Sequence, residues 1–435
     1  MKNEWDRTSR FLSPFWLSSV ASIVVVALSF TPTHFYESVM GEKDLMFLDA
    51  TLYVFVVACL GGFVLGLLVM RRLLPCTTKT TLVYRSGTWL PVALACFSLG
   101  VAVWAAKEFA GSSSLMDALS AGQGEALRRQ ALDAADEGLT AQRLVPAGSP
   151  LLLWAVYRSI DSTGLQRRII YFCVAAYVVC LVLILQRNIL IPFVLAASIL
   201  ISATRFGKAG MNVKRLLTLS FAAGFAVLGS FLAIAQFRGA SQGGRGVAYS
   251  LTGYLPASVN RLSAVLQGAY NPEFPDEPAF TFRFLWYPPF VRRFVNLRDL
   301  HEFFGVQLPL EPLGLWRSEF VQVATGHLNG EFIWATAFGY SFYDFRWLSP
   351  IYFFALGLAA QAVWRAFQAR RIVGVIVYPY FAAAILLWPT DNFMSYPQLW
   401  LYGMVVVALT AVDRPISRKL GDADVGDSQL RTIGR

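Results

Sequence analysis

Arginines stand at two places where an apolar run meets a polar segment. Arg187 lies in Leu185–Ile189, a tight connection between two apolar runs, and Arg238 and Arg245 follow a further run in glycine-rich sequence. The guanidinium fork matches phosphate oxygens, and glycines let backbone N–H groups approach an anion. These arginines are therefore candidates for binding a phosphate-bearing ligand. The alternative is that they reach into lipid headgroups at a membrane surface.

Groups that could accept a proton gather in the segment Trp316–Gly357. Glu319, His327 and Glu331 all lie there, and Asn329 stands between the last two. Removing a proton from a hydroxyl needs a group whose pKa can be tuned toward neutral pH, which histidine and buried carboxyls provide. All three are candidate catalytic bases, and the sequence does not choose among them. Each is also the kind of residue that commonly makes ordinary hydrogen bonds.

A tyrosine and a further arginine follow the glycine-rich segment. Tyr254 belongs to Leu251–Pro256, which leads into an amphipathic helix predicted over Ser258–Leu266 with Arg261 exposed. The hydroxyl of Tyr254 could contact a sugar or a phosphate, and a packed interfacial tyrosine is the alternative. The aromatic stretch Phe284–Phe290 would suit either sugar binding or an aromatic belt at a membrane interface.

Motifs for metal or nucleotide chemistry are missing from the sequence. It contains no Walker A loop, HExxH or GxSxG motif, and the three histidines do not have zinc-ligand spacing. We therefore expect no metal and no cofactor.

The composition indicates which elements must position these residues. Apolar residues make up 56% of the 435-residue chain and charged residues only 15%, whereas soluble domains have roughly 25% charged residues. The net charge of +10 is expected at cytoplasmic helix ends, so we predict no nucleic-acid partner. Apolar runs that are candidates to cross a bilayer are predicted at Pro14–Phe30, Leu48–Met70, Thr88–Ala106, Ile169–Gln186, Ile189–Ala203, Leu216–Gln236, Leu348–Trp364, Ile372–Pro389 and Leu399–Val412. The shorter stretch Val145–Tyr157 is a weaker candidate.

Basic residues alternate from side to side when the weak run Val145–Tyr157 is included. The positive-inside rule then predicts an all-α polytopic membrane protein with about ten transmembrane helices and both termini in the cytoplasm. The membrane domain would span residues 1–413, followed by a disordered cytoplasmic tail at 414–435. Two large outer loops are expected, an amphipathic one at 107–146 and a longer one, with the candidate active site, at 237–345. Gly62 and Gly66 have GxxxG spacing and predict close helix packing.

This arrangement resembles the Wzy-type O-antigen and exopolysaccharide repeat-unit polymerases of bacterial inner membranes, over roughly residues 170–400. The resemblance is carried by Gln186–Leu190, by Arg238 followed by Thr252–Leu255, and by Thr336–Tyr340 running into Tyr343–Phe345 and the span that contains Gly357. The related O-antigen ligases have an outer-loop histidine near an asparagine, and His327 and Asn329 are similar to that pair.

The resemblance implies a metal-independent glycosyltransferase acting at the periplasmic membrane face. A hydroxyl of one polyprenyl-pyrophosphate-linked oligosaccharide would attack the anomeric carbon of another and expel its lipid pyrophosphate. Arg187 and Arg238 would hold the pyrophosphate, helped by Arg245 or Arg261, while Tyr254 and Asn329 would contact substrate. His327, or otherwise Glu319, would be the base. Membrane lipid, a flippase and a chain-length regulator are the partners that the resemblance implies.

Three other functional classes stay open. An O-antigen-type ligase would use the same donor with another acceptor. A lipid-linked sugar flippase or another transporter would need charged groups within the spans, and a scaffold subunit would tolerate loss of the arginines. The polymerase hypothesis requires Arg187 and Arg238 to face one shared cavity.

Overall fold

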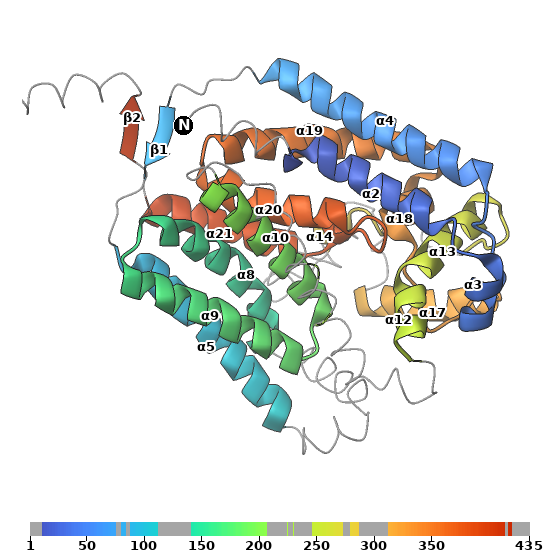
Figure 1. The fold of residues 1–435 in the computed structure, drawn as a ribbon, viewed down its shortest axis with the longest axis horizontal. Helices are drawn as coiled ribbons and strands as arrows, with labels where there is room; N and C mark the ends of the chain where they lie inside the picture. The colour runs from blue at the N-terminus through green and yellow to red at the C-terminus, as the bar shows by residue number, and fades with distance from the viewer. Residues whose placement is uncertain are drawn as a thin grey trace, which may run out of the picture.

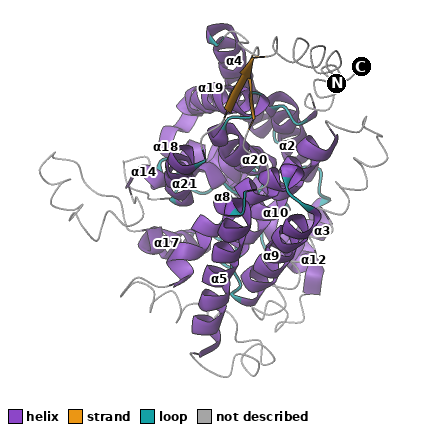
Figure 2. Cartoon of the chain, turned by 90° about the vertical axis from the view of Figure 1, so that its left-hand side faces the viewer, coloured by secondary structure: helices purple, strands orange, loops and turns teal. Residues whose placement is uncertain are grey.

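The computed structural model describes residues 11–74, 80–83, 88–111, 141–206, 224, 229, 246–272, 279–286, 312–413 and 416–419. Within these ranges the chain is helical, apart from one antiparallel pair of short strands, β1 and β2 (Figure 2). The strands are Thr80–Val83 and Ile416–Lys419. The helices are α2 (Pro14–Leu28), α3 (Thr33–Met40), α4 (Ala50–Leu73), α5 (Leu90–Gly111), α8 (Ala141–Arg158), α9 (Gly164–Leu183), α10 (Arg187–Phe206), α12 (Gly246–Tyr254), α13 (Pro256–Leu266), α14 (Arg283–Trp286), α17 (Pro312–Thr325), α18 (Thr336–Phe345), α19 (Ser349–Gln368), α20 (Ile372–Leu386) and α21 (Gln398–Val412).

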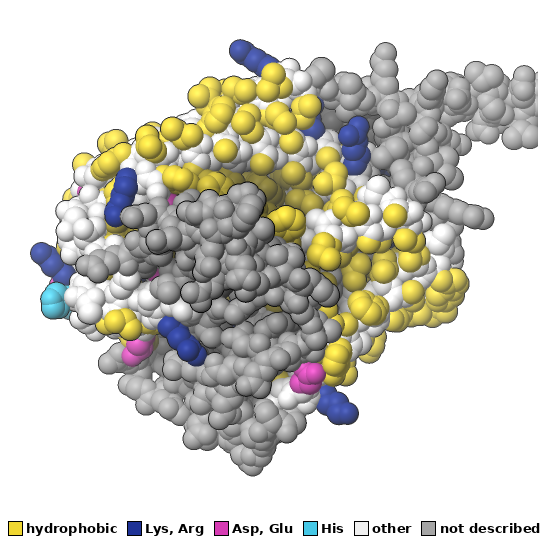
Figure 3. Space-filling view, turned by 180° about the vertical axis from the view of Figure 1, so that it is seen from behind, with side chains coloured by type: hydrophobic (Ala, Val, Ile, Leu, Met, Phe, Trp, Pro, Cys, Tyr) yellow, Lys and Arg dark blue, Asp and Glu magenta, His cyan; other side chains and the backbone are white. Residues whose placement is uncertain are grey.

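Several of these helices are suited to a membrane. Five segments in the described part of the chain are long and apolar enough to cross a bilayer, and a sixth is added if α2 and α3, bent by 85°, count as one span. The five are Ala50–Leu73, Leu90–Phe109, Gly164–Leu183, Arg187–Thr204 and Thr336–Gln368. Hydrophobic side chains cover broad areas of the surface (Figure 3), and such patches are rare on soluble monomers. The protein is therefore a helical, membrane-embedded protein.

Each apolar run predicted from the sequence coincides with a helix, except Leu216–Gln236, which lies outside the described residues apart from 224 and 229. Some of these helices are too short to pass the length criterion, among them α20 and α21. The prediction of ten spans therefore stays a prediction, and so do the two large outer loops. Within those loops the structure describes the ends of α5 and α8 and the short helices α12, α13, α14, α17 and α18.

The closest helix contact joins α4 and α19, which lie side by side in Figure 1. A Cβ atom at Gly66 would collide with the carbonyl oxygen of Phe354, and one at Gly357 would collide with that of Phe63. Gly62 meets the carbonyl of Pro350 in the same way. The GxxxG prediction is confirmed, because only glycine allows these two backbones to approach so closely.

Helix α8 lies at the centre of the bundle and contacts α5, α10, α20 and α21. Its residues Leu152–Val156 are buried. Two prolines interrupt its first half, and proline has no N–H to continue the helical hydrogen bonding. The Tyr177 hydroxyl of α9 donates to the backbone oxygen of Val145 there, at 2.7 Å. Polar contacts from α9 thus support a helix that the sequence marks only weakly.

Contacts at the helix ends join segments that the charge pattern assigns to the same side. Arg158 forms a buried ion pair with Asp413 at 2.6 Å. Strand β2, which follows Asp413 in the chain, pairs with β1. At the other ends of the helices, the backbone N–H of Leu45 donates to Asn260 at 2.7 Å. The candidate site residues of the sequence analysis that the structure describes lie at these other helix ends.

Candidate functional site

Arg187 and Tyr254 come together in the structure. Arg187 is the first residue of α10, directly after a turn in which Leu185 has a φ of 57°. Its guanidinium carbon lies 4.7 Å from the centroid of the Tyr254 ring, within cation–π distance. Tyr254 is placed by the break between α12 and α13, where Pro256 begins the second helix. Two residues predicted to bind substrate therefore share one site.

An aromatic bridge extends from Tyr254 toward a buried acid. The Tyr254 ring lies 4.3 Å from the Trp334 ring, centroid to centroid. Trp334 lies close enough to Asp391, in the connection between α20 and α21, for its side chain to oppose the increase that burial causes in the pKa of that carboxyl. The bridge links the start of α10 to a connection two hundred residues further along the chain.

Asp391 belongs to a polar group centred on Arg283. Arg283 Nη2 lies 3.4 Å from Glu319 Oε1, and the Tyr340 hydroxyl donates to Glu319 Oε2 at 3.3 Å. The Tyr396 hydroxyl donates to Asp391 Oδ2 at 2.6 Å, and the Arg283 guanidinium lies 5.7 Å from the Tyr396 ring centroid. We call Arg283, Glu319, Tyr340, Asp391 and Tyr396 the Arg283 cluster.

Two carboxyls share one guanidinium in the Arg283 cluster. Burial raises the pKa of Glu319 to about 8, and the negative charge of Asp391 adds to the increase, while Arg283 and the hydrogen bond from Tyr340 oppose it. Burial also raises the pKa of Asp391, against its hydrogen bond from Tyr396 and the charge of Arg283. A carboxyl whose pKa lies near neutral pH can exchange protons during catalysis. Of the three predicted bases, Glu319 has this environment.

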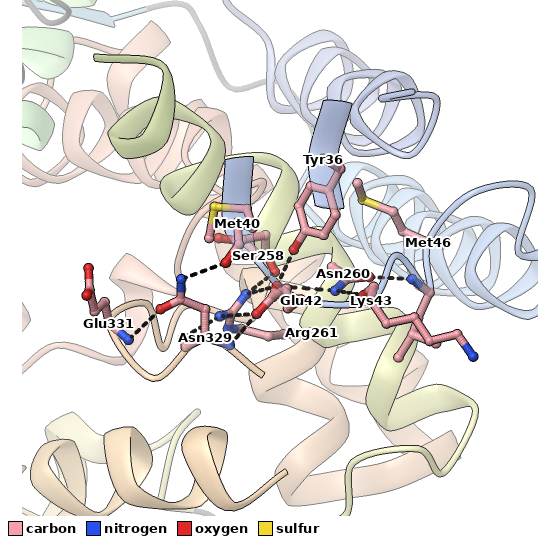
Figure 4. Close-up of polar contacts among 12 residues, drawn as sticks. Tyr36, Met40, Glu42, Lys43, Met46, Ser258, Asn260, Arg261, Asn329 and Glu331 are labelled. Atoms are coloured by element: carbon pink, nitrogen blue, oxygen red, sulfur yellow. Dashed lines mark hydrogen bonds and ion pairs between the residues drawn. The ribbon is translucent and has the colours of Figure 1, made fainter. Parts of the chain in front are cut away.

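Arg261 lies in a second buried network, shown in Figure 4. The two Nη atoms of Arg261 lie 3.2 and 3.3 Å from the carboxylate oxygens of Glu42, which follows α3. The same carboxylate accepts hydrogen bonds from the Tyr36 hydroxyl, the Asn260 side chain and the backbone N–H of Asn329. We call Glu42, Tyr36, Asn260, Arg261 and Asn329 the Glu42 cluster.

The expected exposure of Arg261 is wrong. Every residue of α13 is buried, and Arg261 is 0% exposed, because the helix packs against α4, α12 and α18. The buried guanidinium is neutralised by Glu42 and also donates to the backbone oxygen of Asn329 at 2.7 Å. Arg261 therefore holds protein segments together and is not free to bind pyrophosphate.

Asn329 and Glu331 are also engaged within the protein. The amide nitrogen of Asn329 donates to the Met40 backbone oxygen at 3.0 Å and to the Tyr249 hydroxyl at 2.9 Å. Tyr249 in turn donates to Glu331 Oε2 at 2.7 Å. The side chain of Glu331 is otherwise exposed. These contacts shape the turn after α17 and leave Asn329 little capacity for substrate.

His327 is exposed in the same turn, where its φ of 57° places it in the left-handed region. Its backbone N–H donates to the Ala324 oxygen at 3.1 Å, which closes the end of α17. An exposed histidine in a turn lacks the buried surroundings of Glu319. Arg238 and Arg245 lie outside the described residues, so the shared cavity of Arg187 and Arg238 stays a prediction.

The sequence did not single out Arg283, Asp391 and Trp334 as site residues. Arg283 borders the aromatic stretch Phe284–Phe290, and Asp391 is an isolated acid between two apolar runs. Both signals are visible in the sequence. Arg283 and Asp391 become site residues only because they lie near Glu319 in the fold, and their spacing in the sequence does not predict this. Among the residues that the structure describes, no group of three or more His, Cys, Asp or Glu side chains could hold a metal ion.

Comparison with known proteins gives no family for the chain. No protein-family model, no curated protein and no solved structure matches it. Its function is therefore inferred from the contacts described above.

Proposed function

We propose that this protein is a glycosyltransferase that polymerises polyprenyl-pyrophosphate-linked oligosaccharide repeat units into O-antigen or exopolysaccharide. In the proposal it works at the periplasmic face of a bacterial inner membrane, with about ten spans and cytoplasmic termini. One observation carries it: a series of contacts and electrostatic interactions joins the cation Arg187 to the carboxyl Glu319 through Tyr254, Trp334, Asp391, Tyr396 and Arg283.

Arg187 supplies the positive charge for the departing pyrophosphate. It opens an apolar helix that is long enough to span a bilayer, so its guanidinium lies at the end of that helix. A pyrophosphate attached to an isoprenoid chain needs a cation at this depth, with its lipid tail between apolar helices. The cation–π contact with Tyr254 orients the guanidinium before substrate binds.

Glu319 accepts the proton of the attacking hydroxyl. The hydroxyl oxygen of the incoming repeat unit forms a bond to the anomeric carbon, and the bond from that carbon to the pyrophosphate oxygen breaks. The electron pair leaves with the pyrophosphate, and the hydroxyl proton passes to the Glu319 carboxylate. With a pKa of about 8, Glu319 is a stronger base than an ordinary carboxylate. Pyrophosphate is a good leaving group, so the proposal requires no metal.

The direct test is reconstitution. The purified protein in lipid nanodiscs is given a polyprenyl-pyrophosphate-linked repeat unit in buffer with EDTA, and products are separated by size. The proposal predicts a ladder of chains that grow by whole repeat units. Absence of a ladder would contradict it. Transfer of a single glycan to an added lipid A core would instead favour a ligase, and movement of intact substrate across the bilayer would favour a flippase.

Arginine variants connect the ladder to the site. Arg187→Ala should abolish it, and Arg187→Lys should weaken it strongly, because a lysine cannot make two parallel contacts to phosphate oxygens. Arg168→Ala is the matched control, since Arg168 is an exposed arginine near the start of α9, the end far from Arg187. It should leave the ladder unchanged. A ladder unaffected by Arg187→Ala would remove the proposed pyrophosphate site.

A further inference from the structure

Polar atoms around the Arg283 cluster are buried without a hydrogen-bond partner in the described part of the chain. They are the Tyr270 hydroxyl, Arg283 Nε and the Asn392 side-chain oxygen. Tyr270 is 4% exposed and Asn392 1% exposed. Buried polar groups in native proteins are nearly always hydrogen-bonded, so each such atom requires an explanation. Several of them beside one ion pair indicate a place where a ligand completes the hydrogen bonds.

The Tyr270 hydroxyl lies within electrostatic range of Glu319 and of Arg261. Tyr270 follows α13, where its backbone N–H donates to the Ala264 oxygen at 3.1 Å, and its ring packs so closely on Gly326 that a Cβ there would collide with it. Burial raises the pKa of the Tyr270 hydroxyl, and the negative charge of Glu319 raises it further. The hydroxyl is therefore close enough to Glu319 to interact with its charge while making no bond of its own.

Asn392 is fixed beside Asp391. Its backbone N–H donates to Asp391 Oδ1 at 2.6 Å, and its side-chain nitrogen donates to the Tyr352 hydroxyl at 3.1 Å. These bonds leave the side-chain oxygen as an unused acceptor. Among the described residues, the site thus offers unpartnered donors at Arg283 Nε and the Tyr270 hydroxyl, and an unpartnered acceptor at Asn392.

Aromatic rings surround these polar atoms. The Phe280 ring stacks on Tyr340 with centroids 5.4 Å apart, and the Phe393 ring stacks on Tyr396 at the same centroid distance. The Trp334 ring lies near Asp391 and opposes the increase that burial causes in the pKa of that carboxyl. The side chains of Arg283, Trp334 and Tyr396 are only partly buried, so the cluster reaches the protein surface. Aromatic faces with convergent donors and acceptors suit a ligand that has both C–H faces and hydroxyls.

Charge distinguishes a sugar from a phosphate at this place. Arg283 is the cation of the cluster, and two carboxyls, Glu319 and Asp391, face it. An ionised Asp391 offsets the charge of Arg283 even when Glu319 keeps its proton, so the cluster has no surplus positive charge to attract an anionic ligand. A neutral polyhydroxylated ligand could accept hydrogen bonds from Arg283 and Tyr270 and donate to the carboxyls without any charge penalty.

We propose that the Arg283 cluster, together with Tyr270 and Asn392, is a sugar-binding subsite for the acceptor glycan. Naming the ligand as the acceptor rests on the proposed function, in which Arg187 binds the pyrophosphate of the donor. The subsite presents the attacking hydroxyl to Glu319. Asp391 and Asn392 position the sugar ring, and the aromatic rings contact its C–H faces.

The binding test uses a probe without pyrophosphate: the repeat-unit oligosaccharide released from its lipid by mild acid. Its binding to the full-length protein in nanodiscs is measured by saturation-transfer NMR. Tyr270→Phe removes only an unpartnered hydroxyl, so the protein should keep its melting temperature while its affinity for the oligosaccharide falls about tenfold. Tyr53→Phe is the matched control, because the Tyr53 hydroxyl lies 3.1 Å from Ser29 and outside the cluster. It should bind the oligosaccharide as the wild type does.

Kinetics separate this inference from the proposed function. Tyr270→Phe and Asp391→Asn should raise the KM for the acceptor without changing the affinity for the lipid-linked donor. Arg187→Ala should lose donor binding and keep binding of the free oligosaccharide. Unchanged oligosaccharide affinity and acceptor KM in both Tyr270→Phe and Asp391→Asn would overturn the subsite, even if the ladder forms. Oligosaccharide binding that depends on Tyr270 in a protein that makes no ladder would support the subsite and defeat only the polymerase.

Discussion

The Glu42 cluster and the Arg283 cluster are two arginine–carboxyl groups that differ in their balance of charge. Glu42 meets one guanidinium, and its two oxygens accept hydrogen bonds from four residues (Figure 4). In the other group two carboxyls, Glu319 and Asp391, interact with the single guanidinium of Arg283. The Nε atoms of Arg261 and Arg283 both have no partner among the described residues, but the Tyr270 hydroxyl and the Asn392 side-chain oxygen add unpartnered atoms beside Arg283. A guanidinium paired with one carboxylate holds a fold together, whereas two carboxyls beside one guanidinium are suited to binding and proton transfer.

The Glu42 cluster joins three segments that are far apart in the chain. The turn after α3, helix α13 and the turn after α17 all contribute hydrogen bonds to it, and Asn260 also binds the backbone of Lys43 and Leu45. Tyr249 and Glu331 extend the network toward α12. The same elements carry Tyr254, Tyr270 and Glu319. The Glu42 cluster therefore holds in place the elements on which the Arg283 cluster is built.

The largest effect on stability is expected at the Glu42 cluster. Arg261→Ala leaves Glu42 buried without its cation, so the free energy of unfolding should fall by about 3–5 kcal/mol. The double variant Glu42→Gln with Arg261→Ala should lose less than the sum of the two single variants, because they remove the same interaction. Thermal unfolding in detergent measures both. Additive losses would show that Arg261 and Glu42 do not act as a pair.

Two tyrosines sharpen the comparison. The hydroxyl of Tyr36 donates to Glu42, so Tyr36→Phe should lower the free energy of unfolding by about 1.5–3 kcal/mol, the range for a hydrogen bond to a charged group. The hydroxyl of Tyr270 has no partner in the described residues, so Tyr270→Phe should cost nothing. Equal losses in the two variants would contradict the distinction between the clusters. Thermal unfolding of the two purified variants gives the comparison.

A packing substitution gives a reference that touches neither cluster. A Cβ at Gly66 would collide with backbone atoms of α19, whereas nothing lies within 4 Å of a Cβ at Gly61. Gly66→Ala should lower stability by about 1–3 kcal/mol through overpacking, and Gly61→Ala, the matched control on the same helix, should not. If both variants behave alike, the α4–α19 contact is looser than described.

Glu319 also gives stability a dependence on pH. In the unfolded chain this carboxyl ionises near its ordinary pKa of 4.5, whereas in the folded protein it keeps its proton up to about pH 8. The folded state therefore binds more protons between these values. The free energy of unfolding should fall as pH rises through this window, by at most about 1.4 kcal/mol per pH unit. Glu319→Gln should remove this contribution, and an unchanged pH dependence in the variant would contradict the raised pKa.

Sequence patterns predicted the features that depend on residues close together in the chain. The apolar runs marked the helices, and the spacing of Gly62 and Gly66 predicted the α4 face that packs on α19. The exposure of Arg261 was mispredicted, because the acid that neutralises it is 219 residues away. A helical pattern that contains an arginine reads as amphipathic unless the distant Glu42 is known.

The Arg283 cluster could be predicted only in pieces. Glu319 was one of three equivalent bases in the sequence, and its burial among Arg283, Tyr340 and Asp391 distinguishes it. Arg283 and Asp391 stand on either side of Glu319 in the chain, and each is unremarkable alone. The site is formed by α14, α17, α18 and the connection between α20 and α21, and no local pattern in the sequence shows that these elements meet.

The initial rate of ladder formation, measured against pH for the wild type and Glu319→Gln, tests the central claim most directly. The account predicts a wild-type rate that rises with pH and levels off above about pH 8, where Glu319 is ionised. It predicts a Glu319→Gln rate at least about a hundredfold lower, since general bases contribute that much or more, in a protein that still folds and binds donor. A Glu319→Gln protein that polymerises at the wild-type rate would contradict the account.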